Sequence, residues 1–433
     1  MNREAWKAEF EGKKILIWGF GREGQSSLKW IRDLLPDQAI DIADSGSSEA
    51  LTNAEALPNV RVYKEAHTDF SSYDVILKSP GIVIPEGMDR TNITQQSQLF
   101  LKHQGFQTIG ITGTKGKSTT TSLTACVLSE KYTTHLVGNI GIPCFDVLPK
   151  LKDEDLAAFE ISCHQLEYSP YSPHTAVYLN LYEEHLDHYG SFQAYGDAKA
   201  NIFRHQKEGD IRILSGELPY VSECDDAYLI GRDISGDEHT LRFGDRTMPT
   251  PHTKLLGAHN FMNLSIVYAI ACLYGLSDEE FARGAGKFEP LHHRLELIGE
   301  HHGIRYVNDS ISTIGQTAIA ALNALPDTDV ILIGGMDRGI EYQELEDYLA
   351  SRPDLWTVFM YGTGKRIFEE LKQANRTHDH MCFEPDLAHA VKTASKLCRS
   401  GHIVLLSPAA SSYDAFKNFE HRGTVFEELV KAL

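Results

Sequence analysis

The stretch TIGITGTKGKSTTTS, residues 108–122, joins an apolar strand to a helix through a glycine-rich turn. A phosphate-binding loop commonly reads G-x-x-x-x-G-K-[ST], and Gly116, Lys117 and Ser118 supply the last three positions. The first glycine of that pattern falls on Ile111, so the loop is shortened to residues 113–118. Because a strand precedes the turn and a helix follows it, the sequence predicts a phosphate loop. An unliganded Gly/Ser turn is the alternative.

The predicted loop would hold a nucleoside triphosphate and a metal ion. Backbone N–H groups of residues 114–118 are expected to surround the β- and γ-phosphates. Lys117 would bridge those phosphates, and the Ser118 hydroxyl would ligate Mg²⁺. Glu160 ends the apolar strand in FEISCHQLE (159–167), a position suited to a second Mg²⁺ ligand, although a solvated carboxylate would also fit there.

Composition restricts the class of protein. The chain has 433 residues, too many for one ordinary core, with 42% hydrophobic and 23% charged residues. Its net charge of −19 argues against nucleic acid or an anionic membrane as a partner. The polar start, the lack of a long apolar run and the seven cysteines without a C-x-x-C pair predict a reduced, cytoplasmic chain. We expect it to be a monomer.

Strand-like and helix-like stretches alternate along the chain, which predicts an α/β fold with parallel sheets. The alternation falls into three segments, for which we predict three domains at 1–104, 105–290 and 291–433. The first and third are expected to be Rossmann-like, and the central one to be a P-loop ATPase-type α/β domain.

The first segment carries a second nucleotide signal. GFGREG (19–24) lies between a strand and a helix, and Asp44 ends the next strand 20 residues after Gly24. SPGI (79–82) is another tight turn after a strand and could close the same pocket. The physical requirement is a diphosphate at a helix N-terminus, which any nucleotide diphosphate meets. NAD binding and a purely structural turn are the alternatives.

Polar residues also follow strands in the other two segments. LYEEHLDHYGSF (181–192), which contains His185, comes directly after the strand TAVYLNL, where ligands bind in open α/β sheets. In the third segment, VNDSIST (307–313), GGMDRG (334–339) and SPAASSYDAFKNFEHRG (407–423) each follow a strand. Together the last three predict one binding face. A charged surface loop and ordinary αβ turns are the alternatives.

Taken in order, these motifs resemble the Mur ligase family over essentially the whole chain. The shortened G-T-x-G-K-[ST] loop is that family's variant, and its members use ATP to form an amide bond through an acyl phosphate. GFGREG points to the branch whose first domain holds UDP. The resemblance therefore implies addition of glutamate to UDP-N-acetylmuramoyl-L-alanine, in peptidoglycan precursor synthesis. Folylpolyglutamate synthases share the later domains but lack the first, and rank lower.

The resemblance also implies roles for individual residues. The ATP-binding residues would be Gly113, Thr114, Lys115, Gly116, Lys117, Ser118, Thr119, Asn263, Arg294 and Asp309. The UDP-substrate would contact Gly21, Arg22, Glu23, Asp44, Ser45, Ser79, Pro80, Gly81, Asn139, Ser162 and Gln165. The amino acid would contact Thr313, Arg338, Ser412 and Phe419. Two Mg²⁺ ions would be held by Ser118, Glu160, His185 and Lys199, the last as a carbamate, and the catalytic set would be Lys117, Glu160, His185 and Lys199.

Some positions depart from the family pattern. Ile311 and Ile314 stand where many relatives have lysine and asparagine, and Arg338 stands where lysine is common. Cys163 and His164 replace a more usual Ser-Phe. These changes lie near the predicted amino-acid site, so they concern which enantiomer of glutamate is added. D-glutamate is the prediction, and the L-glutamate-adding type is the alternative. The rival from another class is an NAD-binding protein, which needs neither Glu160, His185 nor Lys199.

Overall fold

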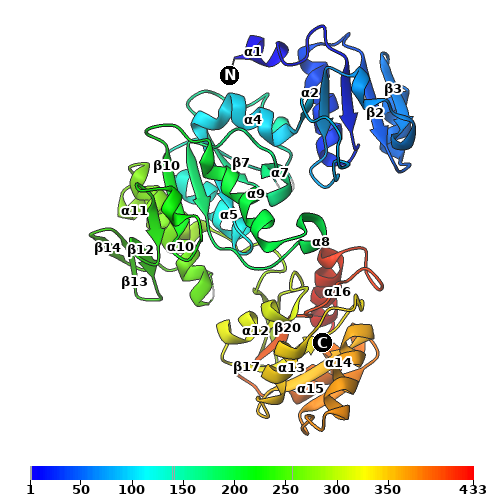
Figure 1. Cartoon of the computed structure of the whole chain (residues 1–433). Coiled ribbons are helices and arrows are strands. Elements are labelled where there is room, and N and C mark those ends of the chain that lie inside the picture. Colours follow the sequence, from blue (N-terminus) through cyan, green and yellow to red (C-terminus); the bar gives the residue numbers. More distant parts are fainter. Residues whose placement is uncertain (1, 139, 141, 256) are drawn as a thin grey trace. The chain divides into compact units, whose positions relative to one another are not determined.

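The computed structural model describes residues 2–138, 140, 142–255 and 257–433, and it contains three sheets (Figure 1). The chain forms two compact units, Met1–Thr253 with Met262–Phe288, and Lys254–Phe261 with Glu289–Leu433. The predicted α/β fold class is confirmed, because strands and helices alternate in each sheet region. The three predicted domain boundaries stay predictions.

The N-terminal sheet is parallel throughout, in the order β3-β2-β1-β4-β5. Its strands are β1 (Ile15–Trp18), β2 (Ile40–Asp44), β3 (Val60–Lys64), β4 (Val75–Lys78) and β5 (Ile93–Thr94). Its helices are α1 (Arg3–Lys7), α2 (Arg22–Leu34), α3 (Glu49–Glu55) and α4 (Gln96–Gln104). Because apolar residues fill all four positions of β1, this strand is buried on both faces, as the centre of a parallel sheet requires.

The second sheet has the order β14-β13-β12-β11-β10-β9-β6-β8-β7. Its strands are β6 (Thr108–Thr112), β7 (Thr134–Gly138), β8 (Leu156–Glu160), β9 (Thr175–Tyr178), β10 (Ile211–Ser215), β11 (Tyr228–Ile230), β12 (Ile234–Gly236), β13 (Thr240–Phe243) and β14 (Arg246–Pro249). The helices of this region are α5 (Lys117–Leu128), α6 (Cys144–Val147), α7 (Cys163–Leu166), α8 (Leu186–Tyr189), α9 (Phe192–Arg204), α10 (Ala258–Leu273) and α11 (Asp278–Lys287). One core cluster includes residues of both the first and the second sheet, among them Ile17 and Phe159.

The third sheet has the order β15-β16-β20-β17-β18-β19. Its strands are β15 (Glu296–His301), β16 (Ile304–Asn308), β17 (Thr328–Ile333), β18 (Trp356–Met360), β19 (Met381–Glu384) and β20 (Ile403–Leu406). Its helices are α12 (Gly315–Ala324), α13 (Gln343–Ala350), α14 (Tyr361–Gln373), α15 (Leu387–Leu397) and α16 (Phe419–Lys431). Short 3₁₀ turns lie at Glu65–His67, Phe70–Ser72, Gly105–Gln107 and Val221–Glu223.

Two parts of these sheets differ from the parallel pattern expected from the sequence. β12, β13 and β14 pair antiparallel at the edge of the second sheet, and β15 pairs antiparallel with β16. Both places are hairpins with short connections, which only antiparallel strands allow. In the described residues, no helix combines the length and the apolar composition that crossing a membrane requires.

Candidate active site

The phosphate loop follows β6 and leads into α5. Ile111 is part of β6 and fully buried, so the strand runs past the point where a longer loop would begin. Gly113 and Gly116 have φ angles of 154° and 83°, and Gly116 is the N-cap of α5. A side chain at Gly113 would place its Cβ 2.9 Å from Leu179 Cβ. The shortened turn therefore needs glycine at both positions.

Asn180 was not predicted from the sequence, yet it anchors this loop from the end of β9. Its Oδ1 accepts hydrogen bonds from the N–H groups of Thr114 (3.1 Å) and Lys115 (2.8 Å). Its amide Nδ2 donates to the Lys115 carbonyl at 3.1 Å. Two of the N–H groups expected to surround phosphate are thus bound to Asn180. The expected role of those two groups toward phosphate stays a prediction, and the N-terminus of α5 is a further part of the loop suited to phosphate.

Two lysine amines meet at a single carbonyl oxygen of the loop. Lys117 Nζ donates to Gly113 O at 2.8 Å, and Lys199 Nζ, from α9, donates to the same oxygen at 2.9 Å. Lys199 is 1% exposed. Burial, together with the neighbouring Lys117 charge, lowers the pKa of Lys199 to about 7. Burial also lowers the pKa of Lys117, so the two amines form a desolvated pair of like groups.

The remaining residues predicted around the triphosphate lie on neighbouring elements. Glu160 ends β8, is 1% exposed, and pairs in register with Ile111 of β6. Ser118 is buried in the first turn of α5, and Thr119 beside it is half-buried. Asn263 of α10 is buried, and its Oδ1 lies 3.0 Å from where a Gly116 side chain would begin. The structure thus brings these predicted positions to the carboxyl end of the second sheet.

The segment after β9 contacts the phosphate loop. Glu184 forms an ion pair with Lys115. The Thr114 hydroxyl lies 3.2 Å from Tyr195 OH and accepts from the Tyr182 N–H at 2.9 Å. His185 follows with a left-handed φ of 56°, a conformation that costs free energy and often occurs at functional sites.

The predicted UDP-substrate residues of the first sheet lie at the carboxyl ends of β1, β2 and β4. Asp44 accepts from the N–H groups of Phe20 (2.7 Å) and Gly46 (2.7 Å), so its carboxylate fastens the glycine turn. The Ser79 hydroxyl donates to Gly19 O at 3.0 Å. Gly21 is the N-cap of α2 and is exposed. Arg22, Ser45 and Gly81 are exposed and Pro80 is half-buried, while Asn139 lies outside the described residues.

A buried lysine stabilises the turn after β4 at the same edge of the first sheet. Lys78 is 2% exposed, and its Nζ donates to the carbonyls of Ser79 (3.1 Å), Pro80 (3.0 Å) and Ile82 (2.7 Å). It was not predicted, although a lysine at the end of an apolar strand was the available signal. Burial lowers its pKa to about 8.

Glu23 connects the edge of the first sheet with the second. It accepts from Gln165 Nε2 at 2.7 Å, and Gln165 is held by a capping box with Ser162 at the start of α7. Burial raises the pKa of Glu23 to about 7. The Glu23–Gln165 contact therefore brings predicted substrate residues from both sheets together.

In the C-terminal unit, the predicted amino-acid residues lie at the carboxyl ends of β16, β17 and β20. Met336 and Ser411 form a backbone bridge, which places the loop with Arg338 beside Ser412. Thr313 and Arg338 are exposed, Phe419 is half-buried and Ser412 is buried. Asp337 is gripped by Arg366 through hydrogen bonds of 2.7 and 3.1 Å, which fixes the loop next to Arg338.

Two buried ionisable side chains, Arg422 and Asp309, form hydrogen bonds within the turns at these strand ends. Arg422 is fully buried and donates to Ser310 Oγ (3.0 Å), Ser310 O (2.8 Å) and Ala410 O (2.9 Å). Sequence reasoning missed it, because only the fold brings α16 to these turns. Asp309 accepts from Ser407 Oγ at 2.8 Å, and burial raises its pKa to about 7. Arg294, predicted to contact phosphate, precedes β15 in this unit.

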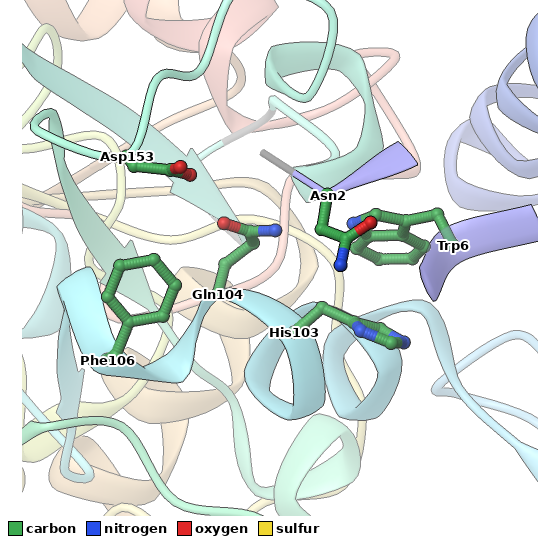
Figure 2. A pocket seen from close by; sticks show the side chains of 6 residues that line it. All are labelled: Asn2, Trp6, His103, Gln104, Phe106 and Asp153. Atoms are coloured by element: carbon green, nitrogen blue, oxygen red, sulfur yellow. The ribbon is translucent and has the colours of Figure 1, made fainter. Parts of the chain in front are cut away.

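A pocket of about 310 Å³ lies apart from these strand ends, where α1 meets the end of α4 (Figure 2). The Trp6 and His103 rings lie side by side there, 4.6 Å apart. Its lining consists of Asn2, Trp6, His103, Gln104, Phe106 and Asp153, and includes no predicted site residue. The candidate site is therefore formed by loops at strand ends instead of by this pocket.

Comparison with known proteins identifies the family of the chain. Residues 111–229 match the Mur ligase middle domain, and residues 293–410 match the Mur ligase glutamate ligase domain. The chain is 31% identical to the UDP-N-acetylmuramoyl-L-alanine–L-glutamate ligase of a Micromonospora species, over 98% of both chains. It is 30% identical to the UDP-N-acetylmuramoylalanine–D-glutamate ligase of Ruminiclostridium cellulolyticum, over 99% of both chains.

Solved structures show the same fold. The MurF ligase of Thermotoga maritima, determined in complex with ADP, superposes with a TM-score of 0.59 at 16% identity, over 91% of this chain and 96% of that one. The full-length sequence relatives and the two matched domains lead to one conclusion: the chain belongs to the Mur ligase family.

Proposed function

We propose that this chain is an ATP-dependent ligase that adds glutamate to UDP-N-acetylmuramoyl-L-alanine, as a monomer in cytoplasmic peptidoglycan precursor synthesis. The main support is the meeting of Lys117 and Lys199 at the phosphate loop, in a chain whose full-length relatives carry this ligase's name. Two buried amines at one oxygen call for a nearby anion, and a triphosphate at the N-terminus of α5 provides it.

The UDP end of the substrate fits the edge of the first sheet. Exposed Gly21, Arg22 and Gly81 surround the turns that Asp44 and Ser79 fasten. From there the Glu23–Gln165 contact leads to α7, which begins directly after Glu160 and β8. The Glu23–Gln165 hydrogen bond therefore links the edge of the first sheet to the segment that follows Glu160.

The chemistry explains the need for concentrated positive charge. A carboxylate is a poor electrophile, so ATP transfers its γ-phosphoryl group to the substrate carboxylate, giving an acyl phosphate and ADP. The amine of glutamate then attacks the carbonyl carbon, and phosphate leaves from the tetrahedral intermediate. Lys117 offsets the negative charge that accumulates in both steps.

The donor atoms of the site fit Mg²⁺. Ser118 offers a hydroxyl, Glu160 a carboxylate and a carbamylated Lys199 two further oxygens, the ligand type that this ion prefers. His185 would complete the set as the ligand of a second ion. Bound Mg²⁺ would supply charge neutralisation between the ATP phosphates and the substrate carboxylate.

Lys199 is the group proposed to carry a carbamate. CO₂ reacts with a neutral amine, and burial beside Lys117 favours that form. The product is an anion next to the Lys117 amine, which replaces a repulsive pair by an attractive one. Lys199→Ala should be largely inactive and partly rescued by short carboxylates. An active protein whose intact mass shows an unmodified Lys199 in the presence of CO₂ would contradict the carbamate.

The amino acid and the nucleoside of ATP would be held largely by the C-terminal unit. Arg338, Thr313, Ser412 and Phe419 are proposed for glutamate, and Arg294 and Asp309, with Asn263 of the first unit, for ATP. The relatives include both L- and D-glutamate ligases at almost equal identity. D-glutamate is our candidate, and the L-glutamate-adding type is the alternative.

Phosphate release from ATP tests the proposal. Release should require UDP-N-acetylmuramoyl-L-alanine together with glutamate, and it should be much faster with one glutamate enantiomer than with the other. Equal release with and without the amino acid would rule out a glutamate ligase.

A further inference from the structure

A compact group of metal-binding side chains lies where α7 and α8 meet. His164 is in α7 and Glu167 is its C-cap, while His188 is in α8. One potential ligand atom from each of these three residues lies within 4.8 Å of the other two. None of the three has a role in the ligase site described above. The group adjoins the ligase site, because the ligand atom of His164 also lies within 4.8 Å of those of Cys163 and His185.

The spacing within this group suits a small divalent ion. His188 Nε2 and Glu167 Oε2 are 3.1 Å apart. Two ligands bound to a tetrahedral Zn²⁺ at ordinary bond lengths are roughly 3.3 Å apart. The His164 and His188 rings are 4.5 Å apart at an angle of 75°, so small side-chain rotations bring the third ligand into place.

The surroundings have the features of a built site. The His188 and Glu167 side chains are 11% and 13% exposed, which shields an ion while leaving a path for its entry. The backbone of α7 is fixed by Gln95, which donates to His164 O at 3.0 Å, and by Gln98, which donates to Glu167 O at 3.3 Å. These contacts hold the backbone from which both side chains project.

A simple hydrogen-bonded pair is the competing explanation for His188 and Glu167. The chain has such pairs elsewhere, for example His174 with Asp210 at 2.7 Å. Within the part of the chain that the structure describes, that pair has no third ligand group, whereas His188 and Glu167 have His164.

The ligand types select the class of metal. Two imidazoles and one carboxylate suit Zn²⁺ and similar transition metals, whereas Mg²⁺ prefers oxygen ligands. We propose that His164, Glu167 and His188 bind one divalent transition metal of the Zn²⁺ class, which fastens the turn carrying His185 to α7. Because His185 has its strained backbone immediately before α8, an ion at His188 would hold that turn in place. The binding of this metal does not depend on the proposed ligase function.

Metal analysis of the full-length protein tests the site. Purified protein is treated with chelator, dialysed against Zn²⁺ with excess Mg²⁺ to occupy oxygen-rich sites, and analysed for bound metal. Wild type should retain one tightly bound Zn²⁺ per chain, and Zn²⁺ should raise its melting temperature. His164→Phe, Glu167→Gln and His188→Gln should each weaken Zn²⁺ binding by more than about a hundredfold, beyond the 10–100-fold effect of losing an outer contact.

Two controls separate the possible outcomes. His174→Gln removes a matched pair partner and should bind Zn²⁺ like wild type. Glu160→Gln should abolish ligase turnover but leave this Zn²⁺ in place, so failure of the ligase proposal and failure of the metal proposal give different results. Thermal unfolding of the metal-free variants shows which of them are folded, and three separate variants guard against the loss of one. Absence of Zn²⁺ from wild type, or equal binding by the folded variants, would overturn the site.

Discussion

Ile311 lies in the turn after β16, at a position where the family resemblance led us to expect a lysine, so we expect another side chain to supply the positive charge for glutamate. Arg338 is the exposed cation on the neighbouring loop, and Asp337 beside it is already held by Arg366. Its guanidinium can grip a carboxylate through two parallel hydrogen bonds, which a lysine cannot.

Arg338→Ala should therefore raise the KM for glutamate by roughly tenfold to a hundredfold, the scale of a charged hydrogen bond of about 1.5–3 kcal/mol. The KM for ATP should change much less. Arg305→Ala, which removes a half-buried arginine paired with Asp327, is the matched control and should change neither value. An unchanged glutamate KM in Arg338→Ala would place the anchor on a different residue.

Glu23 makes a prediction about pH. Its pKa is raised from 4.5 to about 7 by burial, so the folded protein binds a proton there that the unfolded chain has already lost between these pH values. The free energy of unfolding should therefore fall as pH rises from about 4.5 to 7, and the loss should persist above pH 7. The Gln165 hydrogen bond and the Lys78 charge favour the ionised form but offset the burial only in part, and in the described residues Glu23 Oε2 is buried without a hydrogen-bond partner.

Glu23→Gln keeps the shape and removes the charge. Relative to wild type it should gain stability at pH 8, by at most about 3 kcal/mol, and gain little at pH 4.5. Urea unfolding at both pH values measures this difference. A gain of equal size at the two pH values would show that ionisation of Glu23 is not its cause.

At the scale of elements, the phosphate loop depends on the end of β9. Asn180→Ala would leave the Lys115 N–H group without its acceptor, at a cost of about 1–3 kcal/mol in the loop conformation, whereas the Thr114 N–H keeps the Asn180 backbone carbonyl at 3.0 Å. ATP affinity, measured by calorimetry, should fall about tenfold or more, while affinity for the UDP-substrate stays close to wild type.

Asn92→Ala is the control for this change, because Asn92 makes a similar side-chain-to-backbone bond, at 3.0 Å, in the first sheet. It should leave ATP affinity unchanged. If Asn180→Ala binds ATP like wild type, the loop does not need this anchor.

The sequence predicts those elements of the site whose pattern lies within a few consecutive residues. β6, the glycine turn and the start of α5 follow from an apolar run and a G-K-S sequence that need no distant partner. Asn180 and Arg422 could not be predicted, because each acts through backbone groups that only the fold brings near. Lys78 bonds to carbonyls in the turn directly after its strand, so its signal was local and was missed. The hydrogen bonds from the Thr114 and Lys115 N–H groups to Asn180 could not be predicted because that residue is more than sixty positions away.

At the scale of the whole molecule, alternation of strands and helices predicted an α/β chain, and this is what the three sheets show. The antiparallel strands β12, β13 and β14 escaped prediction because each has only three or four residues and carries little periodic pattern. The sequence did not define where each of the three predicted domains begins and ends, because no linker of distinctive composition separates the segments.

The proposed function assigns the two nucleotides to different sheets, which predicts that they bind independently. Lys117→Ala should abolish turnover, by on the order of 3–4 kcal/mol in the barrier, the scale of losing one preorganised donor. Affinity for the UDP-substrate, measured by calorimetry, should stay close to wild type. An equal loss of UDP-substrate affinity would contradict two separate nucleotide sites.

The most direct measurement is mass analysis of the products formed from UDP-N-acetylmuramoyl-L-alanine, ATP and either D- or L-glutamate. The proposed function predicts that the UDP-substrate gains one glutamyl residue with one enantiomer, and that ADP and phosphate appear in equal amounts with it. Lys117→Ala should give neither product. ATP hydrolysis without any glutamyl product, with both enantiomers tested and wild type correctly folded, would contradict the assignment.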